Sequence, residues 1–208
     1  EPSKINTLIG GFRIEKNNIR NSLLAYKEGE KFYSNFVDKY RLVPLGEKIP
    51  IIFSRFLNLS SLGGIEPGNQ KRFFEWENSP PFAAIICYEI TDGLKIQNSV
   101  QDGSKFILAI ANLDPYPSRI FNQYLSLVRM RSIENNIDTV IASNTGPSGL
   151  IRNDGRIDKL MESNKEDNEV VYINLLNKQT FYTHYGIWPL FITFIFISIY
   201  IKFFEDIK

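Results

Sequence analysis

Two apolar runs of strand length constrain the fold of this chain more than any other feature of its sequence. They are Ala83 to Tyr88 and Phe106 to Asn112, and the segment between them has the pattern of a short helix near Leu94 to Gln101. Runs that are apolar at nearly every position are typical of strands buried on both faces. The sequence therefore predicts a strand, helix, strand unit in the middle of the chain.

Further strands and one longer helix are expected around this unit. Thr7 to Ile14 and Ser22 to Tyr26 predict a hairpin, because the asparagines between them tolerate the dihedral angles of a tight turn. Phe121 to Asn135 repeats apolar residues near helical spacing. Strands are also expected at Thr139 to Ser143, Gly149 to Arg152 and Val170 to Asn174, with a hairpin turn at Asn153 to Arg156. Because strands alternate with helices, the predicted fold class is α/β with stacked layers.

The composition allows one substantial core and argues against one class of partner. The chain has 208 residues, of which 43% are hydrophobic, a length that a single domain can fill. Its 24 basic and 23 acidic residues give a formal net charge of +1. No overall positive field therefore points to nucleic acid as a partner.

The C-terminal part of the chain predicts a membrane helix. Ile187 to Ile201 is a run of 15 residues without a charge, slightly shorter than the roughly 20 residues that cross a bilayer. Trp188 and Tyr200 lie near its two ends, as aromatic residues do at membrane interfaces. A buried core element is the alternative. We expect a domain over residues 1–184, a transmembrane helix over residues 185–204 and a cytoplasmic tail over residues 205–208.

Cys87 is the only cysteine of the chain and ends the first apolar run. It cannot form an intramolecular disulfide or a thiolate metal cluster, so it is either a small core residue or a nucleophile. A nucleophilic thiol needs a positive neighbour, and its attack on a carbonyl needs donors for the oxyanion. Lys39 and Glu47 can supply a cation and a carboxylate, although each alone is typical of a solvated surface. His184 precedes the apolar C-terminal run and is not expected to act in catalysis.

Four short motifs, in this order, resemble those of the apolipoprotein N-acyltransferases of the nitrilase superfamily. They are Lys39-x-x-Leu-Val-Pro-x-Gly-Glu47, Ile86-Cys-Tyr-Glu89, Arg129-Met-Arg131 and Trp188-Pro-Leu190. The resemblance covers nearly the whole chain, from about Leu8 onward. It implies a nitrilase-like α-β-β-α sandwich followed by one C-terminal transmembrane helix. It also implies a bacterial inner membrane location, with the nitrilase-like domain facing the periplasm.

The resemblance further implies the chemistry of the site. Cys87 is expected to take a fatty acyl group from a phospholipid as a thioester, and Lys39 to stabilise the oxyanion together with the backbone N–H of Tyr88. Glu47, Tyr88 and Glu89 match supporting positions around the pocket. The acyl group is then expected to pass to the α-amine of the diacylglyceryl-cysteine of an apolipoprotein. This scheme needs no metal and no organic cofactor.

The chain departs from the resemblance in several places. The general-base glutamate of that family is expected upstream of the strand at Leu8, and no segment here matches it. The sandwich is therefore expected to lack its first strand or strands and this base. Leu113 to Pro117 also differs from the loop that the family has at this place. The apolar residues between Glu47 and Gln70 suit either an acyl-chain lid or ordinary packing.

Two other functions stay open on the sequence alone. A nitrilase-like amidase would hydrolyse a small carbon–nitrogen bond through the same cysteine and lysine, but it has no use for a lipid-facing terminal helix. A catalytically inactive, membrane-anchored nitrilase-like module would keep the fold without the general base.

The missing strand and base predict that the isolated chain of 208 residues transfers no acyl group. Purified chain, mixed with phospholipid vesicles and an apolipoprotein peptide, should give no amide-linked acyl product in a mass spectrum. Strong acyl transfer by the isolated chain would contradict this expectation.

Overall fold

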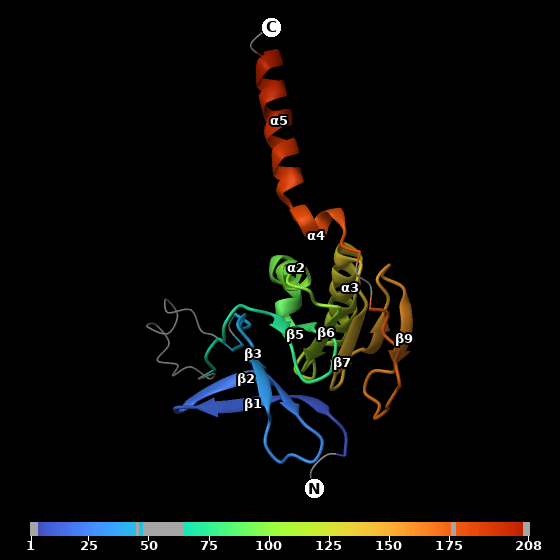
Figure 1. The fold of residues 1–208 in the computed structure, drawn as a ribbon. Coiled ribbons are helices and arrows are strands. Elements are labelled where there is room, and N and C mark those ends of the chain that lie inside the picture. Colours follow the sequence, from blue (N-terminus) through green and yellow to red (C-terminus); the bar gives the residue numbers. More distant parts are fainter. Residues whose placement is uncertain (1–3, 45, 48–64, 176–177, 206–208) are drawn as a thin grey trace.

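A three-stranded sheet and a six-stranded sheet pack together in the computed structural model, and helices cover the outer face of the larger sheet (Figure 1). The structure describes residues 4–44, 46–47, 65–175 and 178–205. The smaller sheet is antiparallel and contains β1 (Thr7–Glu15), β2 (Asn18–Tyr26) and β3 (Asn35–Asp38). The larger sheet contains, in spatial order, β4 (Phe73–Phe74), β5 (Phe82–Ile86), β6 (Phe106–Ala111), β7 (Thr139–Ser143), β8 (Ser148–Ile151) and β9 (Ile157–Met161).

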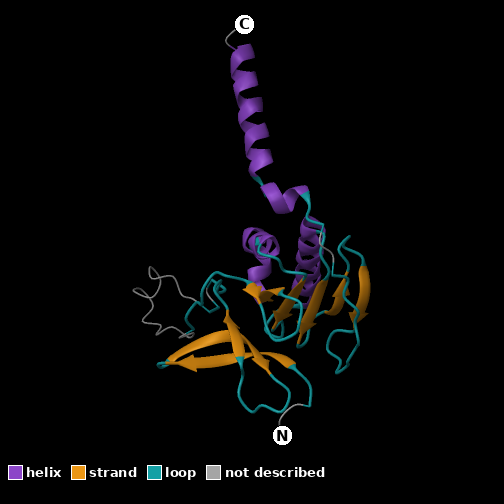
Figure 2. Ribbon diagram, viewed as in Figure 1, coloured by secondary structure: helices purple, strands orange, loops and turns teal. Residues whose placement is uncertain are grey.

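The two sheets and the helices that pack on the larger one form three layers, two of strands and one of helices (Figure 2). The helical layer consists of α2 (Gly93–Gln101) and α3 (Ser118–Asn135), which pack on the larger sheet. Over the smaller sheet, the described part of the chain contains no helix that would complete an α-β-β-α sandwich. The α/β class is confirmed, and the layers present are those expected of a nitrilase-like fold.

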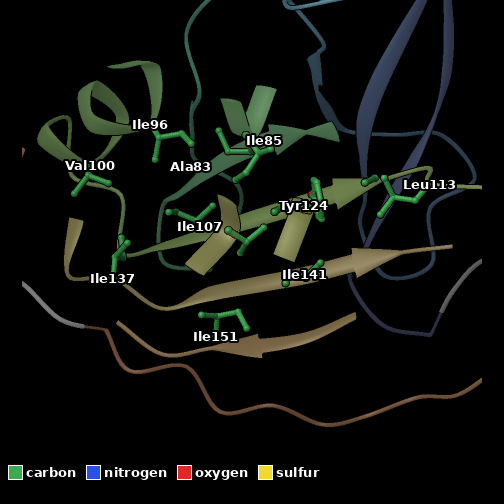
Figure 3. Packing of buried hydrophobic residues seen from close by; sticks show 14 residues of the cluster. Ala83, Ile85, Ile96, Val100, Ile107, Leu113, Tyr124, Ile137, Ile141 and Ile151 are labelled. Atoms are coloured by element: carbon green, nitrogen blue, oxygen red, sulfur yellow. The ribbon is translucent and has the colours of Figure 1, made fainter. Parts of the chain in front are cut away.

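Strand β5 shows why the central strands are apolar on both faces. All five of its residues are buried. Because side chains alternate along a strand, Ala83 and Ile85 point toward the helices, where they pack with Ile96 (Figure 3). Phe82 and Ile86 point the other way and pack in the core between the two sheets. The apolar run in the sequence thus reflects burial on two sides.

The direction of the central strands gathers polar residues at one edge. Strands β5, β6 and β7 run parallel to one another, so their carboxyl ends meet at the same edge of the sheet. Cys87 follows β5, Asn112 follows β6 and Asn144 follows β7. Ligands of open α/β sheets bind at this kind of edge.

Most predicted elements are confirmed. The first hairpin forms as β1 and β2, and its turn places Lys16 and Asn17 at φ values of 47° and 69°. The predicted strand, helix, strand unit is β5, α2 and β6, and the longer helix is α3.

The strand predicted at Val170 to Asn174 is wrong. This segment forms no strand, because its backbone groups bond to side chains: Asn174 N–H donates to Asp138 Oδ2 at 2.9 Å, and the Tyr172 carbonyl accepts from Arg152. The hairpin turn predicted at 153–156 is confirmed: it joins β8 to β9, which pair as antiparallel arms.

The C-terminal region continues as α4 (Phe181–Tyr185) and α5 (Trp188–Glu205). Side-chain amides of α2 attach α4 to the domain, since Gln97 and Gln101 both donate to the Thr183 carbonyl. Helix α5 projects away from the sheets (Figure 1). Among the described residues, no helix combines the length and the apolar character needed to cross a membrane. The transmembrane helix expected over residues 185–204 therefore stays a prediction.

The packing predicts different costs for two isoleucines. Ile107 of β6 is 0% exposed, whereas Ile157 of β9 is 41% exposed. Ile107→Ala should lower the free energy of unfolding by about 2 to 5 kcal/mol, because it removes apolar surface and leaves a cavity. Ile157→Ala should cost less than about 1 kcal/mol. Urea denaturation followed by the fluorescence of buried Trp76 measures both, and equal costs would contradict the described packing.

Candidate active site around Cys87

Cys87 occupies a sharp turn at the end of β5. The chain passes directly from the strand into a short 3-10 helix, η1 (Cys87–Thr91). The φ of Cys87 is 53°, in the left-handed region that residues other than glycine rarely adopt. Such a conformation persists only where the surrounding contacts fix it.

Lys39 directly follows β3, and 1% of its surface is exposed. Its Nζ donates to Glu47 Oε1 at 2.8 Å and to Glu47 Oε2 at 2.6 Å. The same carboxylate accepts a hydrogen bond from the Val43 backbone N–H at 2.8 Å and from the Asn21 amide at 3.2 Å. The carboxylate offsets the cost of burying the ammonium and holds it in one place.

Glu89 is buried behind the turn and does not line the cavity. Its Oε2 accepts from the Ile86 N–H at 2.9 Å, and its Oε1 accepts from the Tyr40 N–H at 2.7 Å. Arg72 Nη1 donates to both oxygens, at 3.1 and 3.0 Å. Burial raises the pKa of the Glu89 carboxyl, and the Arg72 guanidinium and these N–H groups act in the opposite direction. This carboxylate therefore fixes the backbone on both sides of the site.

The thiol of Cys87 lies in a mixed electrostatic environment. Burial raises its pKa above the ordinary value, whereas the Lys39 ammonium lowers it. The Glu47 carboxylate raises the pKa, and the backbone N–H of Tyr88 lowers it. Lys39 is thus the principal group that favours the reactive thiolate.

A cavity of about 990 Å³ opens beside these residues. Cys87, Lys39 and Glu47 all line it. Its apolar wall comes from β1, β5, β6, β7 and neighbouring loops, and includes Leu8, Phe12, Val43, Ile65, Ile86, Ile110 and Val140. Its polar wall includes Asn112, Ser143 and Asn144. A cavity of this size and lining can hold an elongated apolar ligand with a polar end.

The structure separates Tyr88 and Glu89 from the other predicted site residues. The Tyr88 ring lies outside the lining of the cavity, with the Arg41 guanidinium 5.3 Å from its centre, although its backbone N–H acts on the thiol. His184 lies on α4 and also does not line the cavity. In the described part of the chain, no group of histidine, cysteine and acidic side chains is arranged to bind a metal ion. The loop predicted as a lid falls mainly on residues 48–64, outside the described residues.

Sequence reasoning did not find Arg72 or Tyr116. Arg72 follows a polar stretch, Asn69-Gln-Lys71, and nothing in the sequence distinguishes it from a surface arginine. Tyr116 lines the cavity; its pKa is raised by burial first and then by Cys87 and Glu47. Its loop, Leu113 to Pro117, was visible in the sequence only as a departure from the family pattern.

Comparison with curated proteins finds relatives that share one name. A protein from Prochlorococcus marinus subsp. pastoris named apolipoprotein N-acyltransferase is 56% identical over 198 residues, which cover 94% of this chain and 40% of the relative. A protein of the same name from Thermotoga maritima is 28% identical over 210 residues, covering 97% of this chain and 40% of the relative. The chain thus spans about 40% of the length of these relatives. No protein-family model matches the chain.

Solved structures support the fold. Nit3 of Saccharomyces cerevisiae, described as a member of the nitrilase superfamily, matches with a TM-score of 0.59 and 16% identity, covering 78% of this chain and 58% of Nit3. A carbon–nitrogen hydrolase from Helicobacter pylori matches with a TM-score of 0.60 and 13% identity, covering 79% and 60%. The fold of the chain is therefore nitrilase-like.

The electrostatics of the thiol predict the effect of removing Lys39. Lys39→Met in the intact protein should raise the pKa of Cys87 further, because burial and the Glu47 carboxylate then act without the opposing cation. At a pH below the pKa of the Cys87 thiol, the rate of its alkylation by iodoacetamide should fall by about tenfold for each unit by which that pKa rises. Lys71→Met, which removes an exposed lysine, is the matched control and should leave the rate unchanged. Equal rates for the Lys39 variant and the native protein would contradict the assigned electrostatics.

Proposed function

This chain is a homologue of the apolipoprotein N-acyltransferases, and we propose that it carries the acyl-transfer site of such an enzyme. The observation that carries the proposal is the grouping of Cys87, Lys39 and Glu47 on a cavity of about 990 Å³ with a largely apolar wall. A thiol, a fixed cation and space for an alkyl chain are the parts that thioester formation with a lipid requires.

In the first half-reaction, the Cys87 thiolate attacks the carbonyl carbon of an acyl ester in a phospholipid. A carbon–sulfur bond forms, and the negative charge that moves to the carbonyl oxygen is stabilised by the Lys39 ammonium and the Tyr88 N–H. The tetrahedral intermediate then breaks its bond to the lipid oxygen. The lysophospholipid leaves as the alcohol, with the proton that the Cys87 thiol lost on becoming a thiolate, and the acyl group stays on Cys87 as a thioester.

In the second half-reaction, the free α-amine of the diacylglyceryl-cysteine of an apolipoprotein attacks the thioester. A carbon–nitrogen bond forms, the carbon–sulfur bond breaks, and the amine loses a proton while the thiol of Cys87 is restored. The same two donors stabilise the second oxyanion. The product is an amide, and the enzyme returns to its starting state without a metal or an organic cofactor.

Glu47 and Glu89 support this chemistry without serving as the proton acceptor. Both oxygens of each carboxylate already accept hydrogen bonds in the described structure, from Lys39 and Val43 for Glu47 and from Arg72 and Tyr40 among others for Glu89. We therefore assign Glu47 to orienting Lys39 and Glu89 to holding the turn. No described residue is assigned as the general base.

The proposal includes a membrane location. Residues 1–184 are assigned to a nitrilase-like domain at the periplasmic face of a bacterial inner membrane, residues 185–204 to a lipid-inserted helix and residues 205–208 to a cytoplasmic tail. The support is the uncharged run Ile187 to Ile201 and the exposure of its large apolar side chains, such as Phe194 at 69%. A domain held at the bilayer surface can take its acyl donor directly from the lipid.

Trapping the acyl intermediate tests the proposal. The intact protein, reconstituted with phospholipid and no acceptor, should gain the mass of one acyl group on the peptide that contains Cys87. Cys87→Ala should abolish both this mass and the amide product, since it removes the attacking sulfur. Ser99→Ala, in α2 and outside the cavity, is the control and should retain both.

The outcomes also separate the alternatives. Acyl transfer that persists in Cys87→Ala would overturn the assignment of the nucleophile. Hydrolysis of small amides with no acylation by phospholipid would identify an amidase, and the absence of both activities in the intact protein would identify an inactive module.

A further inference from the structure

Among the residues that the structure describes, Arg72 is the largest fully buried side chain, and it takes no part in the mechanism above. It does not line the cavity, so it cannot touch a substrate there. Besides its two bonds to Glu89, its Nη2 donates to the Asp38 carbonyl at 3.0 Å and to the Asn69 carbonyl at 2.6 Å. The Tyr40 ring lies 4.9 Å from its Cζ. Its guanidinium is therefore held from several directions.

These contacts join the two segments that carry the reacting groups. The Asp38 carbonyl directly precedes Lys39, and the Tyr40 N–H, which binds Glu89 at 2.7 Å, directly follows it. On the other segment, the Ile86 N–H directly precedes Cys87 and binds the same carboxylate at 2.9 Å. One guanidinium and one carboxylate thus hold the backbone next to both the lysine and the cysteine.

Stability alone does not account for this arrangement. The Arg72 side chain is 1% exposed and the Glu89 side chain 0% exposed, so both ions have lost their hydration. Apolar side chains of similar volume often stabilise a core as well as a buried ion pair does. They cannot, however, hold a backbone carbonyl and a backbone N–H at fixed positions. The ion pair therefore contributes fixed positions of these backbone groups.

We propose that Arg72 is a positioning residue for acyl transfer: by holding Glu89 and the Asp38 carbonyl together, it sets the separation between the Lys39 ammonium and the Cys87 sulfur. This inference rests on the proposed function and extends it to a residue remote from the substrate. The neighbouring groups that act on the thiol are Lys39, Glu47 and Glu89, and the phenols of Tyr116 and Tyr124 are affected by its charge.

Arg72→Lys in the intact protein tests the proposal. Lysine keeps the positive charge, so the net charge around the thiol is unchanged, but its single ammonium cannot reproduce the two-pronged contacts of a guanidinium. If the segment of Lys39 shifts, the cation acts less strongly on the thiol. The midpoint of iodoacetamide alkylation of Cys87 against pH should rise by about one unit. The kcat of acyl transfer should fall by about 10- to 100-fold, with KM near the native value.

Arg152→Lys is the matched control. Arg152 also pairs with a buried carboxylate, Asp138 at 2.8 Å, and also donates to a backbone carbonyl, that of Tyr172 at 2.9 Å. It follows β8 and does not line the cavity. The control should destabilise the fold without moving the alkylation midpoint of Cys87. A native midpoint and kcat in folded Arg72→Lys, or an equal shift in Arg152→Lys, would overturn the positioning role.

A second variant applies if Arg72→Lys does not fold. Glu89→Asp keeps both charges but shortens the side chain by one methylene, which draws the carboxylate away from Arg72. The midpoint of Cys87 alkylation against pH should therefore rise, as in Arg72→Lys. An unchanged midpoint in the folded variant overturns the proposal. The proposed function fails if the native protein forms no thioester with phospholipid. This outcome does not affect the test of Arg72, because Cys87 can still be alkylated by iodoacetamide. The alkylation midpoints then decide the role of Arg72 by themselves.

Discussion

The ion pair between Arg72 and Glu89 lies where the two sheets and the turn at Cys87 meet. Removing two charges from water costs several kcal/mol for each ion, and this cost is offset only when nearly every donor and acceptor is satisfied. Here the carboxylate accepts from the guanidinium and from the backbone N–H groups of Ile86, Tyr40 and Arg41. These bonds hold the turn whose residue Cys87 has a φ of 53°. The unusual backbone conformation of Cys87 is thus fixed by a buried ion pair and its hydrogen bonds.

The sheet architecture then determines which groups can share the site. Parallel strands β5, β6 and β7 bring Cys87, Asn112 and Asn144 to one edge, and the smaller sheet brings Lys39 to the same place from the end of β3. The cavity has polar groups where strands end and apolar groups where strand faces point inward. Such a division suits a substrate with a reactive polar end and a long apolar part.

Much of the fold could be predicted because its patterns are local. The apolar run of β5 and the turn at Lys16-Asn17 each follow from a few neighbouring residues. The strand predicted at Val170 to Asn174 failed because strand pairing depends on a partner, and here Asp138 and Arg152 engage the backbone groups of the segment instead. Local composition carries no information about such distant side chains.

Some residues of the candidate site could also be predicted from the sequence, whereas the positions of others depend on the fold. Residue chemistry and the resemblance singled out Cys87, Lys39 and Glu47, and the structure brings these residues together. Tyr88 and Glu89 are adjacent to the cysteine in sequence, but a tight turn directs successive side chains apart. The Tyr88 ring therefore lies against Arg41, and the Glu89 carboxylate lies in the interior.

By itself, the sequence determined which residues could supply a nucleophile, a cation and a carboxylate, and which segments must be buried, because these properties belong to single residues and short repeats. Only the tertiary structure decided that Arg72 and Glu89 hold the site while Lys39 faces it. All three are charged side chains that are almost fully buried, and their roles differ solely in the partners that folding places within hydrogen-bonding distance.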